Sequence, residues 1–364
     1  MTTATGSKDA STPAAGGMLP AQSPSRRAWR RFRGNRLGVV SLVLFLTLFT
    51  LSLIAEVISN DRPIVVRFDG HWYFPLIQDL PEATFGGDFA SPTDYLDPLI
   101  RRNLAKADNI AIYPPNPYHY RTINYFSRSP NPAPPDSDNV LGTDDRGRDL
   151  LARLLYGFRT SVIFALIVSG VCALVGVLYG AIQGYFVGWT DIVMERFSEI
   201  WSAMPTLYML IILSSLFAPN FWLLVFLLSV FGWLGIAAYV RAEFLKNRTL
   251  DYVRAARALG QSNRKIMLRH ILPNSLTPVV TLVPFEMAAA IGALTSLDFL
   301  GLGVPPDTPS LGELLSQGKN NLDAWWISLS TFGVLVVMLL LLILVGDALR
   351  DALDPRKVLE ADQQ

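Results

Sequence analysis

Cysteine, histidine and charged side chains are all scarce in this sequence, and each shortage excludes a kind of site. Cys172 is the single cysteine among 364 residues and lies in an apolar run, which excludes an internal disulfide and a cysteine-rich metal site. The three histidines, His71, His119 and His270, are far apart in the sequence. Charged residues make up 17% of the chain, whereas soluble globular proteins average roughly a quarter. The low charge indicates a membrane protein.

Nucleotide-binding and hydrolytic motifs are missing as well. No phosphate-binding loop of the form GxxxxGK followed by Ser or Thr occurs, because residues 318–320 lack both the earlier glycine and the hydroxyl. Neither HExxH nor GxSxG is present, and no nucleophile is paired with a base, which disfavours an intramembrane hydrolase. The net charge of +1 gives no indication of a nucleic-acid partner. We therefore expect neither an enzyme site nor nucleic-acid binding.

Hydrophobic residues are abundant, at 51% of the chain, and the first long apolar run follows a basic stretch. Residues 1–25 are rich in Ala, Ser, Thr, Gly and Pro and predict a flexible cytoplasmic tail. Residues 26–58 begin with arginines and continue as an apolar run over 37–58, about 22 residues, enough to cross a hydrocarbon core of roughly 30 Å. A cleavable signal peptide would have an apolar region of only about 7–15 residues. The run therefore predicts a membrane anchor whose N-terminus is cytoplasmic.

Residues 59–158 are polar and hold half of the 24 prolines of the chain. Such a segment could be disordered, but the clusters at residues 71–74 and 113–125 contain more aromatic side chains than disordered segments usually do. We expect an ordered but irregular extracytoplasmic insert. At its end, Leu150, Leu154 and Phe158 fall on one helical stripe, which fits either an amphipathic helix in the outer interface or the first turns of the next span.

The remaining apolar runs, within residues 159–349, predict five more spans. We place them at residues 161–187, 203–218, 221–242, 275–298 and 326–345, followed by a cytoplasmic tail over 350–364. In the second span, glycines recur at every fourth position, a spacing that lets another helix approach closely in lipid. These packing residues are Gly176, Gly180, Gly184 and Gly188.

A polar, helix-forming loop over residues 243–275 separates the fourth and fifth spans. Small and apolar side chains recur at i, i+3, i+4 and i+7 from Tyr252, so they share one face of a short helix that Thr249 would cap and Gly260 would end. Ser262 would then cap a second short helix that ends at Pro273. Seven basic side chains against two acidic ones predict that this loop is cytoplasmic.

Three separate motifs resemble one family, the permeases of ABC importers. Ala255 and Ala256, then Gly260, then Leu272 and Pro273 resemble the EAA loop of these permeases, and RHILPNSLTP at 269–278 is similar to its peptide-importer form. LGTDDRGRD at 141–149 and FLGLG at 299–303 resemble segments of the same peptide permeases. The resemblance covers residues 25–358, and the long insert and the form TSLDFLGLG look most like the Yej-type permeases of oligopeptide and microcin C-like import.

The resemblance implies an all-α membrane protein of six transmembrane helices, with the type I ABC importer permease fold and both termini cytoplasmic in the bacterial inner membrane. It implies a permease subunit for peptides, paired with a paralogous permease, a periplasmic peptide-binding protein and ATPase subunits that bind ATP and Mg. Arg254 departs from the family, which often has Glu there, and His270 departs from the common Ile. The residues expected to couple to the ATPase are Tyr252, Arg254, Ala255, Ala256, Leu259, Gly260, Arg269, Leu272 and Pro273.

Some alternatives stay open on the sequence alone. Nickel chelates or glycopeptides could replace peptides as substrates, and a membrane-anchored binding or scaffold protein is a candidate of another class. Glu286 lies near the centre of the fifth span, where it either lines the translocation path or is protonated and hydrogen-bonded to a neighbouring helix. Asp298 and Asp347, near the ends of spans, are expected at the membrane interface.

Overall fold

The computed structural model describes residues 24–125, 127, 129–218 and 220–353, so the two predicted tails lie almost entirely outside the described residues. The chain starts with three helices and continues into the insert, which holds three strands and two short helical elements. These elements are α1 (Pro24–Gly34), α2 (Arg36–Leu53), α3 (Ala55–Ile58), β1 (Val65–Phe68), β2 (His71–Tyr73), η1 (Glu82–Phe85), α4 (Pro98–Leu104) and β3 (Ile110–Ile112). The rest of the chain is helical. Its elements are α5 (Leu150–Tyr185), α6 (Trp189–Ser202), α7 (Thr206–Leu216), α8 (Phe221–Gly232), α9 (Leu234–Asn247), α10 (Asp251–Ala258), α11 (Asn263–Lys265), η2 (Ile266–Ile271), α12 (Leu272–Phe299), α13 (Leu311–Asn320) and α14 (Trp325–Leu353).

Five helices of the described chain are long and apolar enough to cross a membrane, and a bent pair gives a sixth crossing if it counts as one span. The third span predicted at 203–218 corresponds to α7, which has only 11 residues and passes as a membrane crossing only together with α6, from which it is bent by 71°. Pro205 stands at the break, where it has no N–H to donate and restricts the backbone of Met204. The chain therefore bends at the start of the predicted span, and residues 189–202, predicted as a cytoplasmic segment, form the other half of the bent pair.

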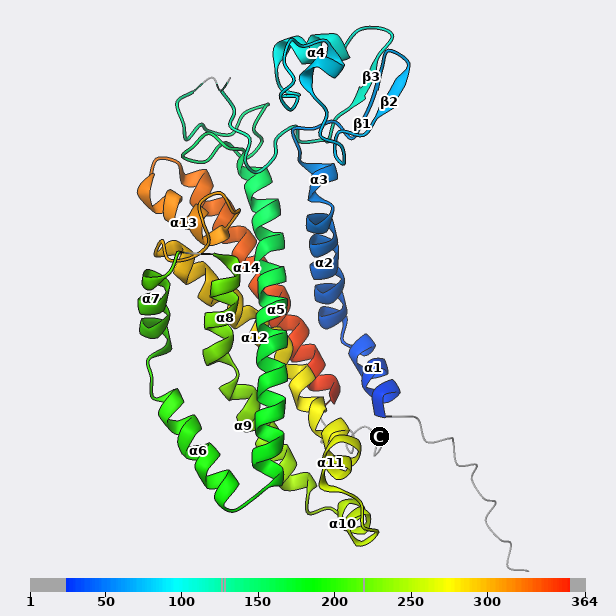
Figure 1. The fold of residues 1–364 in the computed structure, drawn as a ribbon, viewed down its shortest axis with the longest axis vertical. Coiled ribbons are helices and arrows are strands. Elements are labelled where there is room, and N and C mark those ends of the chain that lie inside the picture. Colours follow the sequence, from blue (N-terminus) through cyan, green and yellow to red (C-terminus); the bar gives the residue numbers. More distant parts are fainter. Residues whose placement is uncertain (1–23, 126, 128, 219, 354–364) are drawn as a thin grey trace, which may run out of the picture.

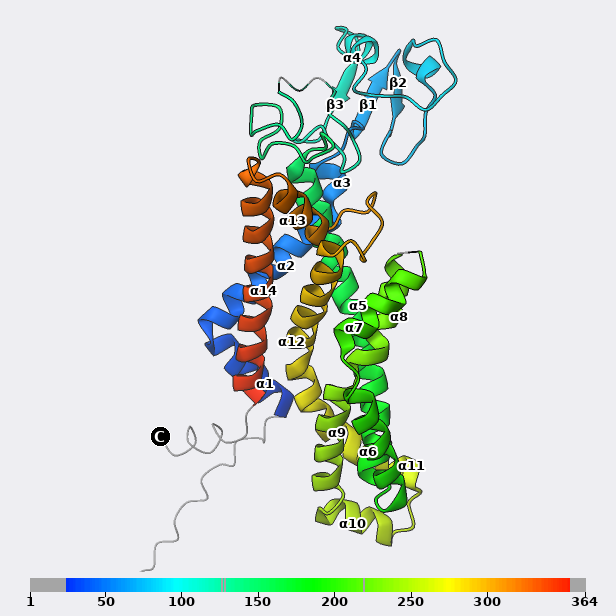
Figure 2. The same cartoon turned by 90° about the vertical axis from the view of Figure 1, so that its left-hand side faces the viewer.

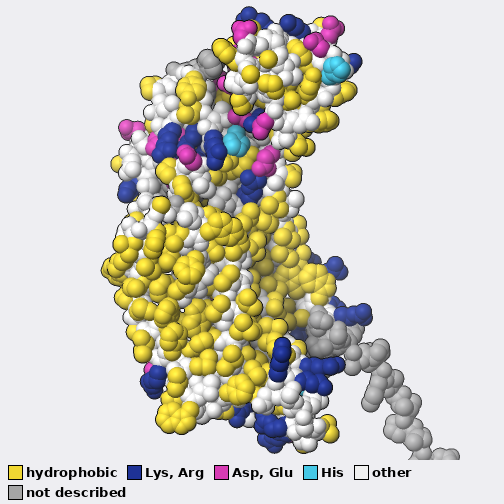
Figure 3. All heavy atoms as spheres, in the orientation of Figure 1, with side chains coloured by type: hydrophobic (Ala, Val, Ile, Leu, Met, Phe, Trp, Pro, Cys, Tyr) yellow, Lys and Arg dark blue, Asp and Glu magenta, His cyan; other side chains and the backbone are white. Residues whose placement is uncertain are grey.

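The helices form an elongated bundle with different structures at its two ends (Figures 1 and 2). The insert with β1 to β3 and α4 stands at one end, and α10 and α11 stand at the other. Hydrophobic side chains cover the middle of the bundle in a broad band, while charged side chains gather toward both ends (Figure 3). The described ends of the chain, α1 and the last turn of α14, pack together through Phe32, Ala348 and Ala352 on the half that holds α10.

The insert is ordered and has a small core of its own, so the expectation of an all-α chain is wrong for this part. Its three strands form an antiparallel sheet in the order β2-β1-β3, with Val66 opposite both Tyr73 and Ala111. Phe85 is fully buried beneath the sheet, in edge contact with the rings of Phe68 and Tyr73. The aromatic clusters thus supply the buried surface that the proline-rich composition otherwise lacks.

Helices α5 and α9 pack closely along the predicted glycine stripe. A Cβ atom at Gly180 would lie 2.3 Å from the carbonyl oxygen of Ala237, and one at Gly176 would lie 2.8 Å from that of Trp233. Gly184 is equally tight against Phe244. Gly188 does not belong to the stripe, because its backbone has a φ of +83° and forms the turn into α6 with open space around it. The fourfold spacing continues past the end of the helix, and only three of its glycines serve packing.

Candidate functional site

The loop predicted to couple to an ATPase, residues 243–275 and called here the coupling segment, forms a compact projection at one end of the bundle. It begins in the last turn of α9, passes through α10 and returns through α11 and η2 into α12. Two short helical pieces joined at a glycine were expected, and the structure contains them. Their boundaries differ from the prediction at both ends.

Neither end of the first helix, α10, is capped by a side chain. Leu250, and not Thr249, stands at the start of α10, and the hydroxyl of Thr249 instead donates to the carbonyl of Lys246 at 2.8 Å. At the other end the prediction for Gly260 is confirmed, since its φ is +73°. The amides of Gly260 and Gln261 donate back to Arg257 and Ala256 at 3.0 and 3.2 Å, the paired bonds of a Schellman turn. This turn satisfies the last carbonyls of α10 without any side chain.

The second helix does not end at Pro273, which corrects the prediction. Residues 266–271 form a π-helical turn in which the amide of Leu272 donates to Met267, five residues earlier. The chain then runs straight on into α12, with Pro273 in its first turn. The register of the helical backbone hydrogen bonds shifts at this point. The missing N–H of Pro273 therefore disturbs the helix little. The second half of the coupling segment is therefore the base of a membrane-spanning helix.

The side chains of α10 divide into an inward and an outward face. Val253 and Ala256 face the chain's own core, at 0% and 4% exposure, together with Ile266 and Ile271. The prediction that Ala256 shares the outward face with Tyr252 and Leu259 is therefore wrong. On the outward face, Tyr252 is 39% exposed and Leu259 is 79% exposed. The other expected coupling residues on the surface are Arg254, Ala255, Gly260, Arg269 and Pro273, and Leu272 is half-buried. A large exposed leucine beside small residues is suited to contact with another protein.

Hydrogen bonds hold the coupling segment to the bundle. Tyr185, in the last turn of α5, donates from its hydroxyl to the side-chain oxygen of Asn263 at 2.7 Å. The amide of Asn247 donates to the Ser275 hydroxyl at 3.1 Å, which links the end of α9 to the start of α12. Within the segment, His270 bonds to Gln261 at 2.8 Å and so fastens the turn after Gly260 to the second helix. A force on α10 is thus passed to three long helices.

Glu286 lies half-buried in α12, where its carboxylate faces α9. A Cβ atom added to Gly235 would lie 3.8 Å from a carboxylate oxygen of Glu286. No ion pair involves Glu286 within the described part of the chain. The Glu286 side chain forms no hydrogen bond within the described residues either, so the bond to a neighbouring helix that the protonated packing role requires is not found, whereas path lining is compatible with this position.

At the opposite end of the bundle, a buried cluster of charges joins the insert to α5 and α13. Arg148 contacts Asp144 at 2.6 Å and Glu313 at 3.4 Å, and Arg153, with no exposed side-chain surface, also pairs with Glu313. The sequence analysis missed this cluster. The sequence feature that could have revealed this cluster is Arg153, an arginine beside the apolar stripe at the start of a long hydrophobic helix.

Burial and charge act in opposite directions on the ionisable groups of this junction. Burial favours the neutral form of Arg148, but the carboxylates of Asp144, Glu313 and Asp145 together outweigh burial and raise the pKa of Arg148. Burial raises the pKa of Asp149, although the amides of Asn139, Ala152 and Asn116 donate to its carboxylate. Asp149 caps α5, which continues unbroken from Leu150, so the stripe at 150–158 is the first turns of the span and not a separate interfacial helix.

Asp298, which was expected at the membrane interface, lies buried at the C-terminal end of α12. Its carboxylate accepts hydrogen bonds from the Ser310 hydroxyl and from the amide of Val304, the latter at 2.7 Å. Glycines at 303 and 312 press against it so closely that a Cβ atom at either would overlap it. Asp298 thus holds the turn between α12 and α13 in place. Asp347 is exposed near the end of α14.

Two family models match the chain. The model described as the inner membrane component of binding-protein-dependent transport systems matches residues 176–358, which include the whole coupling segment. The model described as the N-terminal transmembrane domain of oligopeptide transport permease C matches residues 23–73, which include α1 to α3 and β1. The two matches lie on either side of most of the insert.

Curated relatives match almost the full length. The inner membrane ABC transporter permease protein YejE of Escherichia coli is 49% identical over 336 residues, covering 92% of this chain and 98% of the relative. A YejE of Agrobacterium fabrum, named as a peptidoglycan transport system permease, is 47% identical with 92% and 93% coverage. The dipeptide permease DppC of Lactococcus lactis is 32% identical with 93% and 92% coverage. The chain therefore belongs to the family of inner-membrane permease components of binding-protein-dependent ABC transport systems.

Proposed function

We propose that this chain is the permease subunit of an ATP-driven importer of peptides, including oligopeptides and microcin C-like compounds. The observation that carries the proposal is the coupling segment, which exposes Tyr252, Ala255 and Leu259 while its inner face and hydrogen bonds fix it to α5, α9 and α12. The names of the relatives, which refer to dipeptide, oligopeptide and peptidoglycan transport, support a peptide-like substrate.

In the proposed mechanism the outward face of α10 docks in a groove of an ATPase subunit. ATP and Mg are bound by that partner, and this chain needs no cofactor of its own. When the ATPase dimer closes, α10 moves with it, and the bonds from Tyr185 and Asn247 pass the motion to the long helices. Alternating access to a path between this permease and a paralogous one then follows as a movement of helix pairs.

The proposed orientation places the coupling segment and both termini in the cytoplasm. The basic side chains around α10 favour the inner side of the membrane, and the insert, at the other end of the bundle, would face the periplasmic peptide-binding protein. Six crossings are reached when the bent pair α6 and α7 counts as one crossing beside the five long apolar helices.

Uptake by whole cells tests the substrate class. A strain lacking this chain is complemented with the wild type, and the initial uptake of a radiolabelled unblocked tetrapeptide is compared with that of nickel chelates and a glycopeptide. We expect complementation to restore peptide uptake alone. Restoration of nickel uptake without peptide uptake would contradict the proposal.

A scaffold protein anchored in the membrane is the alternative of another class. It would keep its function when residues 251–258 are replaced by a flexible Gly-Ser linker of the same length. An importer subunit would lose uptake with this replacement while the protein stays in the membrane, which an immunoblot of the membrane fraction checks.

A further inference from the structure

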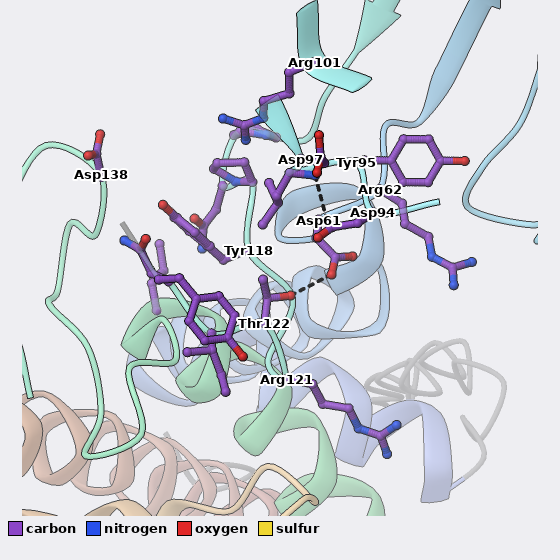
Figure 4. Close-up of a pocket in the computed structure, with 18 of the residues that line it drawn as sticks. Asp61, Arg62, Asp94, Tyr95, Asp97, Arg101, Tyr118, Arg121, Thr122 and Asp138 are labelled. Carbon is purple, nitrogen blue, oxygen red and sulfur yellow. Dashed lines mark hydrogen bonds between the residues drawn. The ribbon is translucent and has the colours of Figure 1, made fainter. Parts of the chain in front are cut away.

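The insert contains a cavity of about 1040 Å³, where the lobe with the small sheet meets the loops that lead into α5. Its walls come from four stretches of chain that are distant in sequence: the end of α3, the start of α4, the proline-rich loop at 115–125 and the loop at 137–140 (Figure 4). Ligand sites in proteins usually have volumes of about 300–1000 Å³, so this cavity has room for more than a single amino acid.

Most charged groups around the cavity already have partners in the fold. Asp61 accepts a hydrogen bond from the Thr122 hydroxyl at 2.7 Å, and Asp97 caps α4 through the amide of Leu99 at 2.6 Å. Arg62 pairs with Asp79 at 2.7 Å. These groups hold the walls together and are not free to bind a ligand.

Arg101, Arg121 and Asp138 have no such partner in the described part of the chain, although the guanidinium of Arg101 lies 5.9 Å from the ring centre of Tyr113 and that of Arg121 lies 5.3 Å from the ring centre of Tyr120. Of these three, Arg101 and Asp138 can act on the cavity. Both side chains are exposed, and neither forms an ion pair within the described residues. Figure 4 shows Asp138 on the loop at one side and the guanidinium of Arg101 turned toward that side from the opposite wall, whereas Arg62 and Arg121 point away. Within the described residues, Arg101 and Asp138 thus face the cavity from separate walls, and neither of them forms an ion pair.

The lining between these two charges is aromatic and proline-rich. Tyr118 is half-buried there, and burial raises the pKa of its hydroxyl. Asp138 raises that pKa further and Arg101 lowers it, so the hydroxyl lies within the electrostatic reach of both groups. Pro115, Pro117 and Tyr125 add flat apolar surface. A flat apolar lining with opposite charges on two walls is complementary to a short extended chain with unlike charges at its ends.

We propose that this cavity binds a short peptide by its two free ends, the terminal carboxylate at Arg101 and the terminal amine at Asp138, with the peptide backbone lying over Tyr118. The guanidinium can hold a carboxylate through two parallel hydrogen bonds, and the carboxylate of Asp138 can accept from an ammonium group. The inference rests on the proposed peptide import and gives it a substrate-binding site on the permease chain outside the membrane-spanning helices.

Binding of blocked and unblocked peptides to the full chain tests the inference. The chain is placed in lipid nanodiscs and titrated calorimetrically with tetra-alanine, its N-acetyl form and its C-terminal amide. The wild type is expected to bind tetra-alanine about tenfold more tightly than either blocked form, as the loss of one charge-assisted hydrogen bond predicts. The R101Q variant should lose its preference for the free carboxylate and keep its preference for the free amine, and D138N should show the reverse.

Two neighbouring exposed charges that do not line the cavity provide matched controls: R102Q and D108N should bind like the wild type. Because Arg101 and Asp138 are exposed, the variants should melt at the wild-type temperature. Equal affinities for all three peptides in the wild type, or unchanged preferences in R101Q and D138N, would overturn the inference.

Uptake in cells separates this inference from the proposed function. Normal tetra-alanine uptake by a complemented strain, with no binding to the chain in nanodiscs, would refute the cavity site and leave peptide import standing. Binding with the predicted preferences, in cells that import no peptide, would support the cavity site and contradict peptide import.

Discussion

Glu286 lies in α12, within the stretch Asn263–Phe299 that is long and apolar enough to cross a membrane, where an ionised side chain is costly unless it meets a polar surface. The cost of a charge at the centre of a membrane helix is about 3 kcal/mol on insertion scales. Glu286 faces the backbone of α9 near Gly235, so the arrangement of this helix pair decides whether the carboxylate meets water. A comparison of the uptake of cationic and neutral peptides can therefore distinguish the path-lining role of Glu286 from a packing role.

If Glu286 lines the translocation path, E286Q should reduce the uptake of cationic peptides about tenfold and leave neutral peptides nearly unchanged, because one favourable charge interaction is worth about 1.4 kcal/mol. The comparison uses lysine-containing and alanine-only tetrapeptides in the same cells. Wild-type rates for both peptides would assign Glu286 to helix packing.

His119 gives the junction below the insert a dependence on pH. Its ring packs on Tyr120 at 4.1 Å and on Tyr156 at 5.2 Å between ring centres, and burial lowers its pKa, with Asp61 acting in the other direction. Between that lowered value and the usual value of about 6.5, the folded protein binds fewer protons than the unfolded chain. Stability from this residue is therefore present above about 6.5 and is lost as the pH falls through that window.

We expect H119Q to weaken the fall in thermal midpoint that the wild type shows between about pH 7 and pH 5 in nanodiscs, the range around the usual histidine pKa. H71Q is the matched control, since His71 is exposed and no such change is expected there. An identical pH profile for wild type and H119Q would contradict this account of His119.

At the scale of elements, α5 and α9 are the pair whose contact depends most on small residues. Their backbones meet at Gly176, Gly180 and Gly184, and no side chain can be added at these positions without moving one helix. Both helices also hold the coupling segment, through Tyr185 and Asn247. A change in this contact should therefore affect stability and coupling together.

The variant G180A should lower the free energy of unfolding by about 1–3 kcal/mol, because the added methyl group overlaps the carbonyl of Ala237. G170A is the control on the same helix, at a position with no neighbouring atom within 4 Å. Denaturant titration of both purified variants measures the difference. Equal stabilities for G180A and G170A would show that the helices can separate without cost.

The Schellman turn after α10 can be tested in the same manner. G260V places a β-branched residue at a φ of +73°, at a cost of roughly 1–2 kcal/mol, and we expect about tenfold lower peptide uptake with normal membrane levels. G260N should transport nearly as well as the wild type, because asparagine tolerates the left-handed region. Full uptake by G260V would mean that the turn has no part in coupling.

The sequence predicted these elements unevenly, for physical reasons. Spacing of small residues located α10 and the turn at Gly260, and hydropathy located the long helices, because both depend on nearby residues. The sheet of the insert was missed, since its strands are three or four residues long and their stability comes from Phe85 beneath them. The prediction that a helix ends at Pro273 failed because a π-helical turn precedes this residue. Such a shift in hydrogen-bond register has no signature in residue type. The ion cluster of Arg148, Arg153 and Glu313 joins residues more than 150 positions apart.

At the scale of the whole molecule, the two candidate functional parts lie at opposite ends of the helix bundle. The insert with its cavity stands at one end of the bundle, and the coupling segment stands at the other, with α5 running the length between them. Asp149 and the charge cluster fix the insert to the first turn of α5, and Tyr185 fixes the coupling segment to its last. One continuous helix therefore connects the coupling segment to the end that holds the insert.

Site-directed cross-linking of α10 tests the central claim most directly. Cysteine is placed at Ala255 or at Leu259 in a C172S background, with L99C in the insert as the control at an exposed site. The account predicts that A255C and L259C cross-link to a co-purified ATPase subunit with a yield that changes on ATP addition, and that an impermeant thiol reagent labels L99C but not A255C in intact spheroplasts. Labelling of A255C from outside, or no cross-link to any ATPase from either α10 position, would contradict it.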